Sequence, residues 1–345
     1  MADAHAAASE APVLSIEDLR VEFDTDDGVL TALDGVNLTL KPGRTLGVVG
    51  ESGCGKSVTA RAALRIEDRN SRIASGRILL RRDHGVEDLA LLARAGRAMR
   101  EIRGREIGLV FQEPMTSFSP VHTIGDQIIE TVELHFQCSR HEARERALAQ
   151  LRAVGTPHPE FILSQYAWEL SGGLRQRAMI AMALVCGPRL LIADEPTTAL
   201  DVTTQAQVLD LLRSLQRQNQ MALMLITHDL GVIAEAADDV AVMYLGRVVE
   251  HGPVAEIFAA PAHPYTRALM NSIPSLVTPK RTRLATLEGS VPHPMARPHG
   301  CPFHTRCRAI IDPVCRTTAP RSLTLSAAHR VDCHLYDSSH TGESA

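Results

Sequence analysis

The pattern of apolar and polar positions divides the chain into strands and helices that alternate. Short, fully apolar runs are typical of strands that are buried on both faces of a parallel sheet; they occupy Thr45–Val49, Ile107–Phe111, Leu190–Ala193 and Leu223–Thr227. Apolar residues at helical spacing or charge-rich segments lie between them and predict helices at Val58–Leu64, Asp88–Arg103, Arg140–Val154 and Thr204–Gln218. Strands that alternate with helices predict an α/β fold.

Other segments depart from this alternation. Val13–Phe23 alternates apolar and polar residues, which predicts an edge strand, and Leu30–Leu40 continues as a strand after a turn. Two further strands, Val240–Tyr244 and Arg247–Glu250, are predicted around Gly246. Residues from about 115 to 170 are mainly helical and contain no strand signal, so we expect a separate helical subdomain there.

A glycine-rich loop follows the first apolar strand. Residues 50–57 read Gly-Glu-Ser-Gly-Cys-Gly-Lys-Ser, which fits G-x-x-x-x-G-K-[ST] between a strand and a helix. Such a loop directs backbone N–H groups at a phosphate, and the helix N-terminus adds positive charge. We expect Lys56 to reach the β- and γ-phosphates and Ser57 to bind Mg²⁺. The nucleotide-binding residues predicted here are Gly50, Ser52, Gly53, Cys54, Gly55, Lys56, Ser57 and Val58.

Polar side chains follow the other apolar strands. Gln112 ends one strand, Asp194 and Glu195 end the next, and His228 follows the last. Adjacent carboxylates at the end of a buried strand are costly without a cation or a proton-transfer role. Asp194 therefore suits a water-mediated hold on Mg²⁺, and Glu195 suits polarising an attacking water. Gln112 could be a core-edge amide or could hold a ligand or water.

Two further features fit a nucleotide-binding protein. Ser171 precedes Gly172 and Gly173 at the start of a predicted helix, where it can act as the N-cap while the glycines allow a close approach to the backbone. Phe23 could stack on an adenine ring, although a half-buried strand aromatic is an equally good reading.

Composition excludes several other classes of protein. The chain has 345 residues, a net charge of -4 and 3% aromatic residues, which argues against a nucleic-acid-binding surface. No apolar run is long enough to span a bilayer, and residues 1–12 lack the apolar centre of a secretion signal. We therefore expect a disordered leader and a cytosolic chain, for which any membrane role would have to come through a partner.

These motifs, in this order, resemble the ATP-binding subunit of an ABC transporter. On that resemblance Gly50–Ser57 is the Walker A motif, Gln112 the Q-loop glutamine and Leu170–Gly173 the signature. Asp194 and Glu195 match the Walker B aspartate and the catalytic glutamate. The remaining matches are the D-loop, Ala199-Leu200-Asp201, and the switch histidine, His228.

The resemblance implies a P-loop NTPase (RecA-like) core of ABC type, with an antiparallel β subdomain and a helical subdomain. Two such chains would sandwich ATP, so that Ser171, Gly172 and Gly173 act on nucleotide held by the partner chain. Glu195, His228 and Gln112 would be catalytic, and Ser57, Gln112 and Asp194 would hold Mg²⁺.

Phe111–Ser117, residues 172–184 and His263–Thr266 further resemble the oligopeptide/dipeptide importer subfamily. Leu174 and Trp168 depart from its common pattern. The resemblance implies a peripheral protein on the cytoplasmic face of the inner membrane. Its partners would be a second, paralogous ATPase subunit, two transmembrane permease subunits and an extracytoplasmic solute-binding protein. Import of nickel or another small solute, a soluble ABC ATPase not tied to transport, and a non-hydrolysing nucleotide sensor are the alternatives.

Four cysteines gather near the C-terminus. Cys301, Cys307, Cys315 and Cys333 are separated by five, seven and seventeen residues. Four thiolates match the ligand set of a four-iron, four-sulfur (4Fe-4S) cluster, which subfamily tails of this kind are associated with. Zinc is the main alternative, with His304 or His334 replacing one thiolate, although close C-x₂₋₄-C pairs are missing; two disulfides would need an oxidising compartment.

The predicted domain organisation has three parts. They are a leader over residues 1–12, an ABC nucleotide-binding domain over residues 13–260, and a cysteine-bearing extension over residues 261–345.

Overall fold

The structure is a computed structural model that describes residues 11–198, 200–272 and 287–341. The chain forms two compact units. The helical unit comprises Met1–Leu14, Leu40–Thr45 and Leu80–Ile226, and the phosphate-loop unit comprises Ser15–Thr39, Leu46–Leu79 and Thr227–Ala345. Each is described by itself. Most of the predicted leader, residues 1–10, lies outside the described residues.

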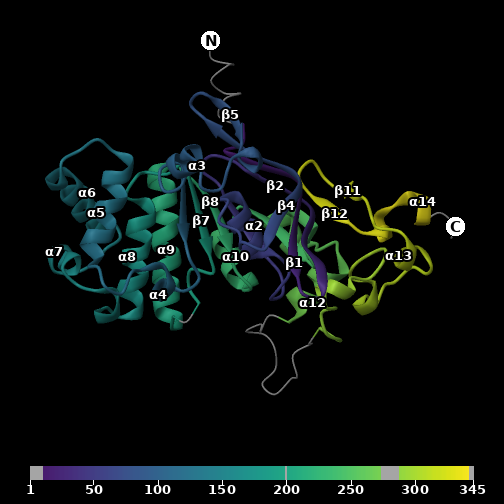
Figure 1. Cartoon of the computed structure of the whole chain (residues 1–345). Coiled ribbons are helices and arrows are strands. Elements are labelled where there is room, and N and C mark those ends of the chain that lie inside the picture. Colours follow the sequence, from purple (N-terminus) through teal and green to yellow (C-terminus); the bar gives the residue numbers. More distant parts are fainter. Residues whose placement is uncertain (1–10, 199, 273–286, 342–345) are drawn as a thin grey trace, which may run out of the picture. The chain divides into compact units, whose positions relative to one another are not determined.

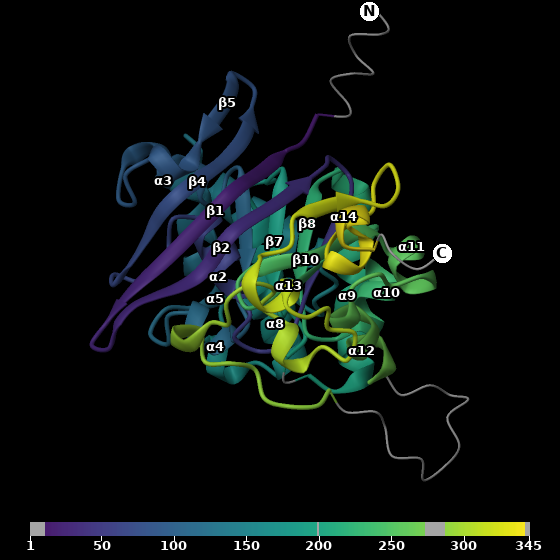
Figure 2. The same ribbon diagram turned by 90° about the vertical axis from the view of Figure 1, so that its right-hand side faces the viewer.

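A sheet of long strands contributes to the phosphate-loop unit. It contains β1 (Leu14–Thr25), β2 (Gly28–Leu40) and β4 (Ser71–Arg82), which lie side by side in Figure 2. The prediction that β1 is an edge strand is wrong, because β1 has β2 on one side and β4 on the other. Alternating apolar and polar residues indicate that one face of a strand is buried. An inner strand of an antiparallel sheet can have one buried face just as an edge strand can, so the pattern does not distinguish the two.

The second sheet of this unit carries the phosphate loop. β3 (Thr45–Val49) is buried throughout and pairs in parallel with β9 (Asp239–Tyr244), with Gly47 opposite Val240. β9 then pairs antiparallel with β10 (Arg247–Pro253), as the pattern around Gly246 predicts. Two short strands, β12 (Arg330–Asp332) and β11 (Ser322–Thr324), extend the sheet from β10.

The helices of the phosphate-loop unit are short. They are α2 (Lys56–Ala63), α10 (Leu230–Ala236), α11 (Val254–Ala259), α12 (Pro264–Asn271), α13 (Val314–Thr317) and α14 (Ser338–Thr341).

The helical unit has three parallel strands. β6 (Ile107–Val110), β7 (Leu190–Asp194) and β8 (Ala222–Ile226) pair in this order, with Leu109 opposite Ile192 and Ile192 opposite Met224. All residues of β7 and β8 are buried, which is why these segments read as continuous apolar runs.

Helices form a large part of this unit. Figure 1 shows α5, α6 and α7 grouped with α8. The helices are α3 (Arg97–Ile102), α4 (Pro114–Ser117), α5 (Ile124–His135), α6 (Arg140–Ala153), α7 (Pro159–Leu163), α8 (Gly172–Leu184) and α9 (Val202–Asn219).

The prediction of one charged helix over 88–103 is largely wrong. The segment begins at the end of a short strand, β5 (Gly85–Asp88), continues as a 3₁₀ turn over Leu89–Leu91, and becomes helical only in α3. The Asp88 side chain accepts a hydrogen bond from Ala90 N, and Gly96 stands at the N-cap of α3. Both residues favour interruption over a continuous helix.

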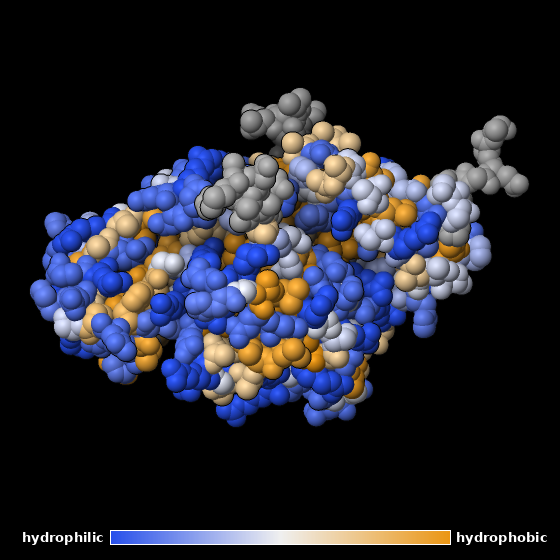
Figure 3. Space-filling model, turned by 90° about the horizontal axis from the view of Figure 1, so that it is seen from above, coloured by the Kyte–Doolittle hydropathy of each residue, from blue (hydrophilic) through white to orange (hydrophobic). Residues whose placement is uncertain are grey.

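The described part of the chain has no helix that is both long enough and apolar enough to cross a membrane. The face shown in Figure 3 mixes polar side chains with smaller apolar patches.

Candidate functional site

The glycine-rich loop joins β3 to α2 and has a backbone shape that requires glycine. Gly50 has a φ of 155°, and a Cβ atom there would lie 2.2 Å from the Met243 carbonyl oxygen. Gly55 has a φ of 106°, and a Cβ there would lie 2.6 Å from Leu33 Cδ2. Any larger residue at either position would displace its neighbours. Gly55 is also the N-cap of α2 and has no side chain with which to cap the helix amides.

Lys56 lies inside this loop. Its side chain is buried, with 5% of the residue exposed, and Nζ donates hydrogen bonds to Gly50 O at 2.8 Å and Glu51 O at 3.3 Å. The loop therefore curls around its own cation, as a loop that receives phosphate oxygens requires. Ser57 and Val58 are half-buried in the first turn of α2.

Two other predicted residues belong to the same unit. Phe23 is half-buried near the end of β1, and His228 is exposed. Thr227 N donates to Val48 O at 3.2 Å, so the segment that carries His228 is attached to the strand that leads into the phosphate loop.

The helical unit brings together Gln112, the predicted Q-loop glutamine, and Glu195, the second of the two adjacent carboxylates. Gln112 Nε2 donates to Glu195 Oε2 at 3.0 Å, and Thr198 Oγ1 donates to the same oxygen at 2.9 Å. Asp194, at the end of β7, is 8% exposed. Glu195 has a φ of 46°, in the left-handed region that non-glycine residues rarely adopt. Such strain persists where the surroundings enforce it, often at functional sites.

The predicted signature residues begin α8. Ser171 is the N-cap, and its side chain accepts a hydrogen bond from Leu174 N at 3.4 Å. Ser171 and Gly172 are exposed and Gly173 is half-buried, so the start of this helix is open to a second molecule. In the predicted D-loop, Asp201 caps α9 through Thr204 N at 3.0 Å, while Ala199 lies outside the described residues.

The sequence did not predict the contacts that Glu51 makes. Both terminal nitrogens of Arg306 donate to its carboxylate, at 2.7 and 3.1 Å, and its backbone N donates to Tyr265 OH at 2.9 Å. The one hint in the sequence is that Glu51, a charged residue, occupies a position of the G-x-x-x-x-G-K-[ST] motif at which any residue is allowed.

The four C-terminal cysteines have free thiols. Burial, with smaller contributions from the charges of Cys315, Cys333 and Cys307, raises the pKa of Cys301 to about 12. Within the described ranges, however, no three His, Cys, Asp or Glu side chains converge as metal ligands would. The predicted iron–sulfur cluster and its zinc alternative therefore lack support from the geometry.

Comparison with family models gives two matches. Residues 33–198 match the ABC transporter family, and residues 249–315 match the oligopeptide/dipeptide transporter C-terminal region.

Curated relatives match over nearly the whole chain. A probable peptide ABC transporter ATP-binding protein from Sinorhizobium fredii is 48% identical over 93% of this chain and 94% of its own length. The dipeptide transport ATP-binding protein DppD of Bacillus subtilis is 44% identical over 94% of this chain and 95% of its own.

Among solved structures, the dimeric MJ0796 bacterial ABC transporter cassette is similar, with a TM-score of 0.61 and 25% identity. The match covers 70% of this chain and 98% of that one. The two family matches thus cover the phosphate loop and part of the C-terminal region. The chain therefore belongs to the ATP-binding proteins of ABC transporters, in the oligopeptide/dipeptide transporter family.

Proposed function

We propose that this chain is the ATPase subunit of a membrane importer, where it binds and hydrolyses ATP to power the uptake of di- or oligopeptides. The observation that carries the ATPase assignment is the phosphate loop, in which two glycines allow the backbone to curl around the buried Lys56 ammonium. The peptide assignment is supported by the names of the curated relatives and by the matched C-terminal region.

The residues divide the chemistry of phosphoryl transfer between them. Lys56 and the amides of the phosphate loop would bind the β- and γ-phosphates, and Phe23 would stack on the adenine. Ser57, Asp194 and Gln112 offer the oxygen ligands that suit Mg²⁺, which when bound neutralises developing phosphate charge. Glu195 would orient and deprotonate the attacking water, and His228 would contact the γ-phosphate.

The signature residues would complete a second nucleotide site. The N-terminus of α8 is a suitable place for the γ-phosphate of ATP held by a second ATPase subunit, because Ser171 and Gly172 are exposed there and a helix N-terminus attracts anions. We propose a paralogous chain as that partner.

Exposed apolar side chains of the helical unit fit contact with membrane subunits. Trp168 is 57% exposed, stacks on Tyr166 with ring centroids 5.6 Å apart, and donates its indole N–H to Pro120 O at 3.3 Å. Phe161 and Val121 are also exposed. Large apolar groups held rigidly at a surface are typical of interfaces. We propose two permease subunits as the occupants, with an extracytoplasmic binding protein delivering the solute and this chain peripheral on the cytoplasmic face.

Two experiments test the proposal. Purified chain should release phosphate from ATP in the presence of Mg²⁺, and a Lys56→Ala variant should not. Cells that lack the gene should lose uptake of a labelled dipeptide while retaining uptake of nickel. Loss of nickel uptake alone would favour the nickel importer instead, and ATP hydrolysis without any transport defect would favour a soluble ABC ATPase.

Two finer predictions stay proposals. One is the division into a nucleotide-binding domain at residues 13–260 and an extension at residues 261–345. The other is a 4Fe-4S cluster on Cys301, Cys307, Cys315 and Cys333, for which the number of thiols is the support. Anaerobically purified protein should then be brown with about four irons per chain. Colourless protein, with zinc or with no metal, would contradict the cluster.

A further inference from the structure

An ion pair joins the phosphate loop to the C-terminal region. Arg306 Nη1 lies 2.7 Å and Nη2 3.1 Å from the two carboxylate oxygens of Glu51, the second residue of the loop. The Arg306 side chain is only 4% exposed and that of Glu51 27%. Burial lowers the pKa of Arg306, but the hydrogen bonds to Glu51 and Tyr244 and the Glu51 charge outweigh it, so the net shift is upward. This bidentate geometry fixes direction as well as distance.

A second contact reaches the backbone of the same residue. Tyr265 OH accepts a hydrogen bond from Glu51 N at 2.9 Å, and Tyr265 is completely buried. Its ring packs against Tyr244 and Phe303, with centroids 4.7 and 5.4 Å away. The Arg306 guanidinium lies 5.9 Å from the Tyr244 ring centroid and 6.0 Å from that of Phe303. The rings of Tyr244 and Phe303 therefore pack against both side chains that contact Glu51, Tyr265 and Arg306.

Glu51 in turn touches the cation of the loop. Its carbonyl oxygen, together with that of Gly50, accepts the hydrogen bonds of Lys56 Nζ. A movement of Glu51 would change where the Lys56 ammonium rests.

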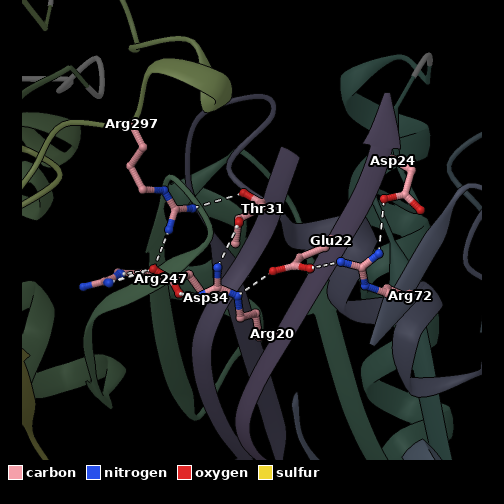
Figure 4. Close-up of polar contacts among 8 residues, drawn as sticks. All are labelled: Arg20, Glu22, Asp24, Thr31, Asp34, Arg72, Arg247 and Arg297. Carbon is pink, nitrogen blue, oxygen red and sulfur yellow. Dashed lines mark hydrogen bonds and ion pairs between the residues drawn. The ribbon is translucent and has the colours of Figure 1, made fainter. Parts of the chain in front are cut away.

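A second arginine of the C-terminal region, Arg297, belongs to another network of contacts. In Figure 4, Arg297 reaches Asp34 and Thr31, and Arg247 and Arg20 reach Asp34 as well. Arg297 Nη2 also donates to Leu245 O at 2.5 Å.

Gly246, the residue after Leu245, connects these contacts to the phosphate loop through hydrogen bonds. Gly246 N donates to Cys54 O at 2.9 Å, and Asp34 N donates to Gly246 O at 2.9 Å. Side chains of the C-terminal region thus contact residue 51 of the phosphate loop directly, and reach residue 54 through Leu245 and Gly246.

We propose that Arg306 and Tyr265 are positioning residues that hold the phosphate loop in the shape that accepts ATP, so that the C-terminal region sets nucleotide affinity. This rests on the proposed ATPase function. Buried ion pairs often add little net stability, and in some proteins they specify geometry instead. A loop already held in its bound shape loses less conformational entropy when the ligand binds. The C-terminal region would then raise affinity without contacting the nucleotide.

Three variants test the proposal against a matched control. Arg306→Gln removes the ion pair, Arg306→Lys retains the charge without the bidentate geometry, and Tyr265→Phe removes only the acceptor for Glu51 N. The control is Arg308→Gln, since Arg308 makes an exposed ion pair with Glu288, 82% and 72% exposed, outside the loop.

Nucleotide binding is the first measurement, by displacement of a fluorescent ATP analogue from the full chain. We expect Arg306→Gln to weaken ATP binding about tenfold and Tyr265→Phe by several-fold, as is usual for coupling between contacting groups. The KM for ATP should rise accordingly while kcat changes less, and Arg306→Lys should restore part of the affinity. Arg308→Gln should match the wild type.

A second measurement needs no nucleotide. Cys54 lies in the loop and is 2% exposed, so its alkylation rate, followed by mass spectrometry of the peptide, reports the shape of the loop. We expect faster alkylation of Cys54 in Arg306→Gln and Tyr265→Phe, with Cys138 of the helical unit unchanged as an internal reference.

The outcomes separate the two proposals. A wild-type chain that does not bind ATP refutes the proposed function, while Cys54 alkylation still tests whether Arg306 and Tyr265 hold the loop. Wild-type affinity and wild-type Cys54 reactivity in both Arg306→Gln and Tyr265→Phe overturn the positioning role, as does an equal loss in Arg308→Gln. If Arg306→Gln does not fold, Tyr265→Phe decides alone.

Discussion

The Gln112 side-chain amide holds the Glu195 carboxylate in one orientation, with Nε2 3.0 Å from Oε2. The Thr198 hydroxyl donates to the same oxygen at 2.9 Å, and Glu195 N donates to Ile226 O at 2.9 Å. Side chain and backbone of Glu195 are thus fixed from several directions, which is how a left-handed backbone is maintained outside glycine. A carboxylate held in this way is suited to orient a water molecule.

Replacement of Glu195 by glutamine should separate binding from turnover. Glu195→Gln keeps the size of the side chain but removes the proposed general base, so ATP hydrolysis should fall by about 10²- to 10⁴-fold. ATP affinity should stay near the wild-type value because the phosphate loop is unaltered. Phosphate release and equilibrium nucleotide binding measure the two quantities, with Glu145→Gln on exposed α6 as the control. Turnover within a few-fold of the wild type would show that another group is the base.

Removal of the Lys56 ammonium should weaken the binding of ATP itself. Lys56→Ala deletes the ammonium that donates to Gly50 O and Glu51 O, and with it the charge-assisted contact to the phosphates. We expect ATP affinity to fall by at least about tenfold, since hydrogen bonds to charged groups are worth about 1.5–3 kcal/mol. Lys41→Ala, in an exposed turn, is the matched control for loss of one positive charge. Unchanged affinity in Lys56→Ala would contradict the assignment of the phosphate loop.

The sequence predicts local features of the site well and distant couplings poorly. The glycine pattern predicts the phosphate loop, because the positive φ angles at Gly50 and Gly55 are a local requirement. The buried strands before Gln112 and Asp194 are likewise readable from continuous apolar runs.

The ion pair between Arg306 and Glu51 is different, since 255 positions separate the two residues. No spacing rule connects charges that far apart. The inner place of β1 was missed for a similar reason, because strand order depends on partners elsewhere in the chain.

An arginine in place of Ser171, in the predicted signature, should block hydrolysis of the ATP that the partner chain binds. Ser171→Arg places a long side chain at the open start of α8, where the partner's γ-phosphate would approach. In a mixed dimer with one variant chain, ATP bound by the partner should no longer be hydrolysed, while the variant's own phosphate loop binds ATP normally. Ser214→Arg, on an exposed position of α9, controls for the added charge. Loss of nucleotide binding at the variant's own loop would refute the shared site.

Stability should fall in mild acid because of a buried histidine. Burial, together with the positive charge of Arg267, lowers the pKa of His263 to about 3. His263 is 1% exposed, and its Nδ1 accepts a hydrogen bond from Tyr265 N at 3.0 Å, which requires that nitrogen to be unprotonated.

Below the ordinary histidine pKa of about 6.5, the unfolded chain takes up a proton at this residue that the folded chain refuses. The contribution of His263 to the free energy of unfolding is therefore complete at neutral pH. It should decline by up to about 1.4 kcal/mol per pH unit as pH falls from 6.5 toward 3.

His263→Asn tests this prediction, because asparagine can still accept the Tyr265 N–H as the N-cap of α12 but does not titrate. Urea unfolding at pH 7.5, 6.5 and 5.5 should show a shallower loss of stability in the variant than in the wild type. The difference should reach about 1 kcal/mol between pH 6.5 and 5.5. Loss of the His263 ring, whose centroid lies 5.7 Å from that of Phe303, lowers the free energy of unfolding by the same amount at every pH. Comparing how steeply the free energy of unfolding falls with pH therefore removes this constant difference. His141→Gln, at an exposed position of α6, should leave the slope unchanged. Equal slopes in the wild type and His263→Asn would show that the buried imidazole is not the group that couples stability to pH.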